Sequence, residues 1–170
     1  MFDKLDTGSI SPDEFRNEIR TISGLNISDQ DIDSAWNAML LDMPKQRIHL
    51  LENAKKYYRT FLLSNTNAIH YPEYSKYLLA EHGYESLSML FEKQYLSHEI
   101  KLRKPNIEAF QHILSENNLK PSETLFFDDT AQHVAGAKKA GLNAYWLDLS
   151  KESIDDIFEN GVFKESLLKP

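Results

Sequence analysis

The sequence lacks cysteine, which excludes disulfides, thiolate metal sites and a cysteine nucleophile. It is short of basic residues, with 19 Lys and Arg against 26 Asp and Glu. The resulting net charge of −7 argues against a nucleic-acid groove or an anionic membrane surface as partner. No apolar run approaches the ~18 residues of a membrane span, and the first residues do not have the pattern of a signal peptide. These absences predict a cytoplasmic protein that binds neither nucleic acid nor membrane.

The composition is that of a globular domain. Of the 170 residues, 41% are hydrophobic and 11% aromatic, and the mean hydropathy is −0.50. A chain of this length can bury a core as one domain, or as one domain with a small appendage.

The beginning of the chain has only helical patterns. Ser11 and Glu14 have the spacing of a capping box, and Gly24 is expected to end the helix that follows. Ser28 is expected to cap a second helix, whose apolar stripe would be formed by Ile32, Trp36, Met39 and Leu40. A third helix is expected before residue 56, and nothing up to that point predicts a strand.

After residue 56 the spacing of apolar residues changes from a helical period to short apolar runs that alternate with helical segments. Strands are predicted at 60–64, 94–97, 124–127 and 143–147, alternating with helices at 71–83, 105–118 and 131–140, and a last helix from about Ser153. This alternation predicts an α/β fold with right-handed crossovers, a mostly parallel, Rossmann-like sheet and helices on both of its faces.

Polar side chains follow three of the predicted strands. Ser64 and Asn65 lie at the end of the first strand, Lys104 lies in the loop after the second, and Asp128 and Asp129 follow the third. Ligands of such sheets bind outside the carboxyl ends of the strands. A hydroxyl, an ammonium group and two carboxylates at one edge are suited to hold a phosphoryl group beside Mg²⁺.

Each of these residues also has an ordinary structural explanation. Ser64 and Asn65 could form a polar turn, Lys104 could be solvated, and Asp129 could cap the following helix. Asp128 is harder to explain in this way, because a charge beside a buried strand end is costly without a counter-charge. The order of these residues after successive strands favours the functional interpretation.

Three segments resemble known motifs. The sequences FLLSNTN (61–67), KLRKPNIEAF (101–110) and LFFDDTAQHVAGAKKAG (125–141) are similar to the second, third and fourth motifs of the haloacid dehalogenase-like (HAD) hydrolase superfamily. The similar branch has a small helical cap and includes sugar-phosphate phosphatases and the phosphatase domain of soluble epoxide hydrolases. The resemblance implies a partial helical cap over residues 1–45 and a Rossmann-like core over residues 46–170.

The resemblance also implies roles for individual residues. Ser64, Asn65 and Lys104 would act on the phosphoryl group of a small phosphorylated metabolite, and Asp128 and Asp129 would hold Mg²⁺ directly or through water. His133 stands where relatives often have Asn, so its contribution is an open question.

The first motif of the family is not found. It would be an apolar strand that ends in Asp-x-Asp, and its first Asp would be the nucleophile. The segment DQDID (29–33) opens a helix, and DKLDTG (3–8) has the wrong spacing. We therefore expect an N-terminally truncated chain that lacks the central first strand of the family, is nearly inactive alone and binds Mg²⁺ weakly. Unpaired strand edges would then favour a homodimer.

Three functions remain open at this point. The first is a Mg²⁺-dependent phosphatase that acts through an aspartyl-phosphate. The second is a non-catalytic phosphate-binding or interaction protein with the same fold. The third is a haloacid dehalogenase, against which the paired acids argue, because those relatives work without metal.

Overall fold

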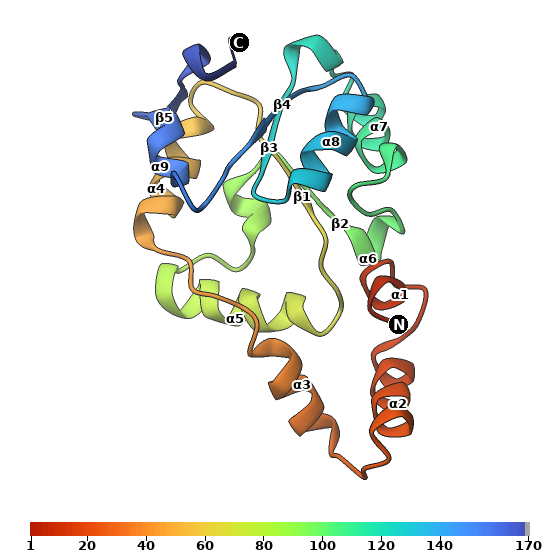
Figure 1. The fold of residues 1–170 in the computed structure, drawn as a ribbon. Helices are drawn as coiled ribbons and strands as arrows, with labels where there is room; N and C mark the ends of the chain where they lie inside the picture. The colour runs from red at the N-terminus through yellow and green to blue at the C-terminus, as the bar shows by residue number, and fades with distance from the viewer. Residues whose placement is uncertain (169–170) are drawn as a thin grey trace. The chain divides into compact units, whose positions relative to one another are not determined.

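The computed structural model describes residues 1–168, and the chain divides into two compact units. The first unit comprises Met1–Lys45 and Phe61–Lys101; the second comprises Gln46–Thr60 and the described part of Leu102–Pro170. Figure 1 shows the elements of both. The division implied by the resemblance, a cap over 1–45 and a core over 46–170, stays a prediction.

The first unit combines five helices with a pair of strands. Its elements are α1 (Phe2–Asp6), α2 (Pro12–Ser23), α3 (Asp29–Asn37), β1 (Phe61–Ser64), α5 (His70–His82), the 3-10 turn η1 (Leu87–Leu90), β2 (Lys93–Leu96) and α6 (Ser97–Ile100). β1 and β2 run parallel, with Phe61 opposite Lys93 and Ser64 opposite Leu96.

The predicted starts of α2 and α3 are confirmed. Ser11 caps α2 and accepts a hydrogen bond from the Glu14 N–H, while the Glu14 carboxylate accepts one from the Ser11 N–H at 2.7 Å. Gly24 ends α2 in the left-handed conformation, with φ of 69°. Ser28 caps α3 by accepting a hydrogen bond from the Asp31 N–H on its side chain. Helix α1 was not predicted, because five residues are too few to show a helical period.

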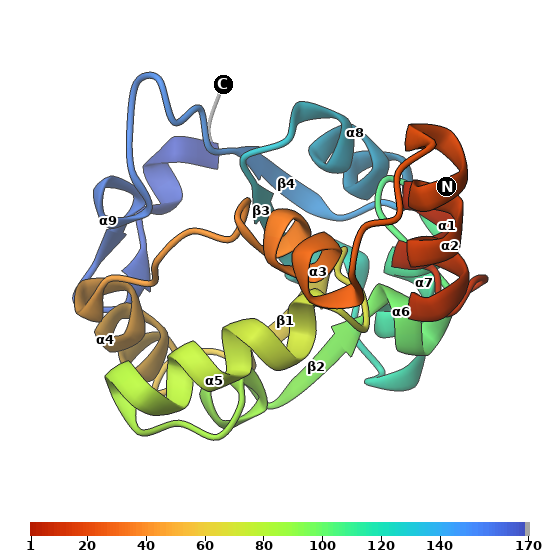
Figure 2. The ribbon, with the colours of Figure 1, turned by 90° about the horizontal axis from the view of Figure 1, so that it is seen from below.

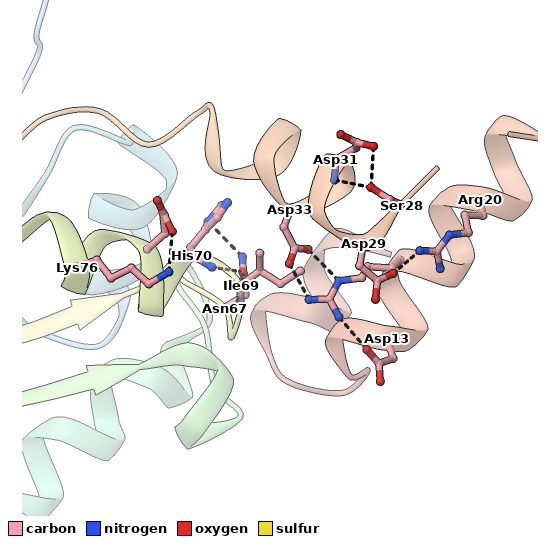
Figure 3. Close-up of polar contacts among 12 residues, drawn as sticks. Asp13, Arg20, Ser28, Asp29, Asp31, Asp33, Asn67, Ile69, His70 and Lys76 are labelled. Atoms are coloured by element: carbon pink, nitrogen blue, oxygen red, sulfur yellow. Dashed lines mark hydrogen bonds and ion pairs between the residues drawn. The ribbon is translucent and has the colours of Figure 1, made fainter. Parts of the chain in front are cut away.

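Ion pairs join α2 to α3. The Arg16 guanidinium donates to both carboxylate oxygens of Asp33, at 2.9 and 2.7 Å, and Arg20 pairs with Asp29. Figure 3 shows these acids facing α2. Arg20 also donates to the Ile27 carbonyl at 2.7 Å. The two helices therefore form a hairpin that is held by charge as well as by its apolar faces.

The core of the first unit lies beneath this hairpin. Its buried members are Leu5, Phe15, Ile32 and Ile69, and the half-buried Trp36 packs against them. The expected stripe of α3 is partly wrong: the helix ends at Asn37, so Met39 lies beyond it with 58% of its surface exposed.

Asn67 organises the start of α5. Its side-chain carbonyl accepts hydrogen bonds from the Ile69 and His70 N–H groups, at 3.1 and 3.0 Å (Figure 3). Its amide nitrogen donates to Asp6 at 3.1 Å and to Nδ1 of His70 at 3.3 Å. The His70 Nε2–H donates to the Trp36 carbonyl at 3.1 Å. Asn67 thus connects α1 to α5, and His70 extends the connection to α3, which the sequence did not suggest.

The second unit is built around a second parallel strand pair. Its elements are α4 (Lys45–Ala54), α7 (Ile107–Glu116), the 3-10 turn η2 (Pro121–Glu123), β3 (Leu125–Asp128), α8 (Ala131–Lys139), β4 (Asn143–Trp146), α9 (Ile154–Ile157), β5 (Phe158–Glu159), β6 (Val162–Phe163) and the 3-10 turn η3 (Glu165–Leu168). Leu125 lies opposite Asn143 and Asp128 opposite Trp146.

Alternate residues of β3 pack on opposite faces. Phe126 meets Phe110 of α7 edge-to-face, with ring centroids 5.1 Å apart. Leu125 and Phe127 pack instead against a buried cluster from the C-terminal segment, whose members are Leu147, Ile157 and Phe163. Figures 1 and 2 both place α8 beside β3 and β4. The predicted α/β fold with parallel strands is confirmed, and in this unit both faces of the strand pair are covered.

Two predictions for the second unit need correction. The helix expected over 105–118 is shorter, and the last helix spans only four residues before an antiparallel β5–β6 hairpin that was not predicted. The hairpin turns at Asn160 and Gly161, with φ of 52° and 84°. Asn-Gly is the sequence signal for such a turn, but strands of two residues are too short to show alternation.

Within residues 1–168, no helix has both the length and the apolar character that a membrane crossing requires.

The buried His70 and the half-buried His98 of the first unit predict a pH-dependent stability. Burial lowers the pKa of His70, against the hydrogen bond to the Trp36 carbonyl, and burial also lowers the pKa of His98, against the charge of Glu99. The unfolded chain therefore binds more protons below about pH 6.5, so the free energy of unfolding should fall as pH drops from about 7.5 to about 5.5.

Urea denaturation at the two pH values measures this effect. His98→Gln should flatten the dependence, whereas His49→Gln, at a histidine whose side chain is 70% exposed, should not. Equal slopes in all three proteins would contradict the assignment.

Candidate functional site

A buried ion pair lies at the carboxyl end of β3. Asp128 is the last residue of that strand, and Lys104 lies in the loop before α7. The Lys104 Nζ is 2.6 Å from Oδ2 of Asp128, and the two side chains are 10% and 9% exposed. The counter-charge that the sequence required for Asp128 is therefore supplied by another predicted site residue.

Two further donors hold the other carboxylate oxygen. Oδ1 of Asp128 accepts a hydrogen bond from the Thr130 N–H at 2.8 Å and lies 3.0 Å from Nδ1 of His133. Burial alone would raise the pKa of Asp128, but the charge and hydrogen bond of Lys104, together with the Thr130 N–H, hold that pKa below its usual value. Asp128 is thus a carboxylate at neutral pH.

Asp129 differs from its neighbour. It is exposed, and its carboxylate has a long contact of 3.4 Å with the Thr130 hydroxyl. Its backbone carbonyl accepts a hydrogen bond from the indole N–H of Trp146 at 2.9 Å. Trp146, at the end of β4, is 46% exposed. The carboxylate of Asp129 is therefore open to solvent while its backbone is fixed by the next strand.

The loop that carries Lys104 packs closely on α8. A Cβ atom at Gly136 would lie 2.2 Å from the carbonyl oxygen of Pro105 and 3.1 Å from the ring of Phe110. Only glycine permits this approach. The helix that presents His133 is thereby held against the loop that presents Lys104.

The remaining predicted residues lie in the first unit. Ser64 ends β1, and Asn65 follows it. The fully buried Ser97 ties the loop after β1 to the start of α6, because its hydroxyl accepts from the Thr66 N–H at 3.0 Å and donates to the Thr66 carbonyl at 2.9 Å. The structure brings Lys104, Asp128 and Asp129 together within one unit; the roles of Ser64 and Asn65 stay predictions.

The acids fit one class of metal site. No group of three or more His, Cys, Asp or Glu side chains within residues 1–168 could enclose an ion. Mg²⁺ needs no such cage: it prefers oxygen ligands, keeps several waters and is held through one or two carboxylates. Asp128 and Asp129 supply carboxylates of that kind at one strand end, so they fit Mg²⁺.

Two residues at this strand end were not assigned from the sequence. His133 was noted only as a departure from a motif, and Trp146 was not considered. The register of β3 and β4, which sets Trp146 opposite Asp128, would have drawn attention to it.

Removal of the counter-charge should destabilise the fold. Lys104→Met leaves a buried, unpaired carboxylate, which is expected to cost about 3–5 kcal/mol in the free energy of unfolding. The double variant Lys104→Met/Asp128→Leu should recover most of that loss. Lys120→Met is the control, because the Lys120–Glu123 pair is exposed and should contribute less than about 1 kcal/mol. A Lys104→Met variant as stable as the wild type would contradict the buried pair.

The packing at Gly136 gives another test. Alanine in a helix ordinarily stabilises by about 1 kcal/mol relative to glycine. Here the added methyl group would strike the Pro105 carbonyl, so Gly136→Ala should destabilise by about 1–3 kcal/mol in thermal or urea unfolding. Ala135→Ser, at an exposed position on the same helix, should have little effect. A gain in stability from Gly136→Ala would show that the loop does not pack as described.

Comparisons with known proteins find a phosphatase and HAD family enzymes that are similar to this chain. A D-ribitol-5-phosphate phosphatase of Bacteroides thetaiotaomicron is 28% identical over 150 residues, which cover 85% of this chain and 70% of the relative. A crystal structure of a HAD family enzyme from the same organism, a point mutant in complex with magnesium and inorganic phosphate, superposes with a TM-score of 0.85 at 33% identity and covers 94% of this chain and 78% of that one.

A HAD-like family hydrolase of Porphyromonas gingivalis is also similar in structure, with a TM-score of 0.80 and 29% identity over 91% of this chain and 75% of its own. A family model described as haloacid dehalogenase-like hydrolase matches residues 15–141, which is well over half of the chain. The chain belongs to the haloacid dehalogenase-like hydrolase family.

Proposed function

We propose that this chain is a Mg²⁺-dependent phosphatase component that acts on a small phosphate monoester. The observation that carries the proposal is the pairing of Lys104 with Asp128 at the end of β3, beside the open carboxylate of Asp129. Similar proteins named as a phosphatase, and solved with magnesium and phosphate, support it. The matching relative makes D-ribitol 5-phosphate and other phosphorylated polyols the first substrates to assay.

The proposed roles follow from charge. Asp128 and Asp129 would hold Mg²⁺, which supplies electrostatic stabilisation of the phosphoryl oxygens. Ser64 and Asn65 would donate hydrogen bonds to those oxygens. The Lys104 ammonium would balance their charge, as well as that of Asp128. Hydrolysis would pass through an aspartyl-phosphate. We assign no residue of this sequence as the nucleophile that forms it.

A second function is favoured by the lack of an assigned nucleophile in this sequence. A chain with the anion-binding and metal-binding groups but without an Asp-x-Asp strand end could bind phosphate without hydrolysing it. Under either function we propose a cytoplasmic protein. Association through strand edges stays a prediction, which light scattering tests.

Turnover distinguishes the two functions. We predict that the 170-residue chain has almost no phosphatase activity with excess Mg²⁺, because loss of a nucleophile costs on the order of 10⁶ in rate in a well-studied hydrolase. A version extended by a strand that ends in Asp-x-Asp should be active, and Lys104→Ala should abolish that activity. Substantial turnover by the 170-residue chain that Lys104→Ala abolishes would mean that another carboxylate acts as the nucleophile. No activity in the extended version on a broad panel of phosphate esters would favour the binding protein.

Metal binding should be weak but specific to the two acids. Asp128 already accepts hydrogen bonds from protein donors on both oxygens, and near-octahedral Mg²⁺ needs more oxygen ligands than two carboxylates provide. Calorimetry should therefore find no tight Mg²⁺ binding by the isolated chain, and Asp129→Asn should weaken it further. Tight binding, or binding indifferent to Asp129→Asn, would contradict the proposed ligands.

A further inference from the structure

His133 contacts the carboxylate that the proposed function places at the metal. It lies in the first turn of α8, its side chain is 17% exposed, and its Nδ1 is 3.0 Å from Oδ1 of Asp128. The resembled motif often has Asn at this position, so the resemblance itself assigns His133 no role.

The direction of this hydrogen bond follows from its partner. An ionised carboxylate only accepts hydrogen bonds, so Nδ1 of His133 must carry the proton that it shares with Oδ1. In a neutral ring this leaves Nε2 without a proton. The contact therefore depends on the ring nitrogen nearer to the backbone.

The acceptor sites of Asp128 can be counted. A carboxylate has about four lone-pair sites, two on each oxygen. Oδ1 faces the Thr130 N–H and His133 Nδ1–H, and Oδ2 faces the Lys104 ammonium. Of these four sites, one on Oδ2 remains. Without His133, Oδ1 would also have a site left, and the carboxylate could turn about its Cβ–Cγ bond.

We propose that His133 is a positioning residue that saturates Oδ1 of Asp128, so that Oδ2 is the oxygen presented to a metal ion. The proposal rests on the proposed function of the two acids. It makes His133 a group that acts through Asp128 and has no contact with substrate. Outer partners of ligating carboxylates typically change metal affinity by about 10–100-fold when they are removed.

Two substitutions separate the two ring nitrogens. In His133→Asn the amide nitrogen takes nearly the place of Nδ1, so the hydrogen bond to Asp128 is kept. In His133→Gln the amide nitrogen takes nearly the place of Nε2, so that bond is lost while a polar amide of similar size remains. Thermal unfolding without metal checks that both variants fold.

Mg²⁺ titration of the whole chain, taken to high concentration, supplies the main readout. Trp146 reports on the site, because its indole N–H is bound to the Asp129 carbonyl, and the signal should disappear in Trp146→Phe. We expect His133→Asn to bind Mg²⁺ within about threefold of the wild type and His133→Gln about tenfold more weakly. Nitrogen NMR of the metal-free wild type should find a proton on Nδ1 of His133.

The outcomes separate this inference from the function on which it rests. If Asp128→Asn weakens Mg²⁺ binding but His133→Gln does not, the positioning role is wrong and the metal site stands. Equal losses in His133→Asn and His133→Gln also overturn the role, because the effect then does not follow the Nδ1 donor. If Asp128→Asn binds Mg²⁺ as the wild type does, the metal site itself is wrong, and this inference fails with it.

Discussion

The Lys104–Asp128 pair is the interaction on which the second unit depends. A carboxylate that is 9% exposed at the end of an apolar strand would be expelled or protonated without a counter-charge, and the ammonium nitrogen 2.6 Å away supplies it. To reach that point, the loop of Lys104 must lie against α8, which the missing side chain of Gly136 allows. The charge, the loop path and the glycine are therefore parts of one constraint.

This constraint fixes Asp128 and leaves the carboxylate of the neighbouring Asp129 open to solvent. Asp128 is held by donors on both oxygens, whereas Asp129 presents an exposed carboxylate on a backbone fixed by Trp146. Two adjacent residues of the same type thus have different environments. One is preorganised by the protein and the other is open to a ligand, an arrangement that suits a hydrated cation held beside a phosphoryl group.

Much of this could be predicted from the sequence because it is encoded locally. The cap at Ser11, the stop at Gly24 and the apolar runs that became β1 and β3 each need only a few neighbouring residues. The pairing of Lys104 with Asp128 was predictable as a juxtaposition, because the sequence places both residues after predicted strands whose carboxyl ends were expected to share one edge. Family membership then followed from three short motifs in order.

The parts that were missed depend on contacts across the chain. The Asn67 network joins residues more than sixty positions apart, and no local sequence pattern indicates it. Trp146 acquires its contact with the Asp129 carbonyl from strand register, and His133 acquires its contact with the Asp128 carboxylate from the pitch of α8. The strands of the hairpin after α9 have only two residues each, which is too short to show an alternation of apolar and polar side chains. Such features arise from tertiary packing.

We propose that Asp128 and Asp129 hold a metal ion at the carboxyl end of β3. A crystal structure of the chain soaked in Mn²⁺, which shares the preference of Mg²⁺ for oxygen ligands and scatters anomalously, tests it most directly. We predict an anomalous peak at the Asp129 carboxylate, on the side of Oδ2 of Asp128, with Lys104 and His133 still bound to Asp128. Peaks only at other carboxylates, with Asp129 unchanged, would show that these two acids do not hold the ion.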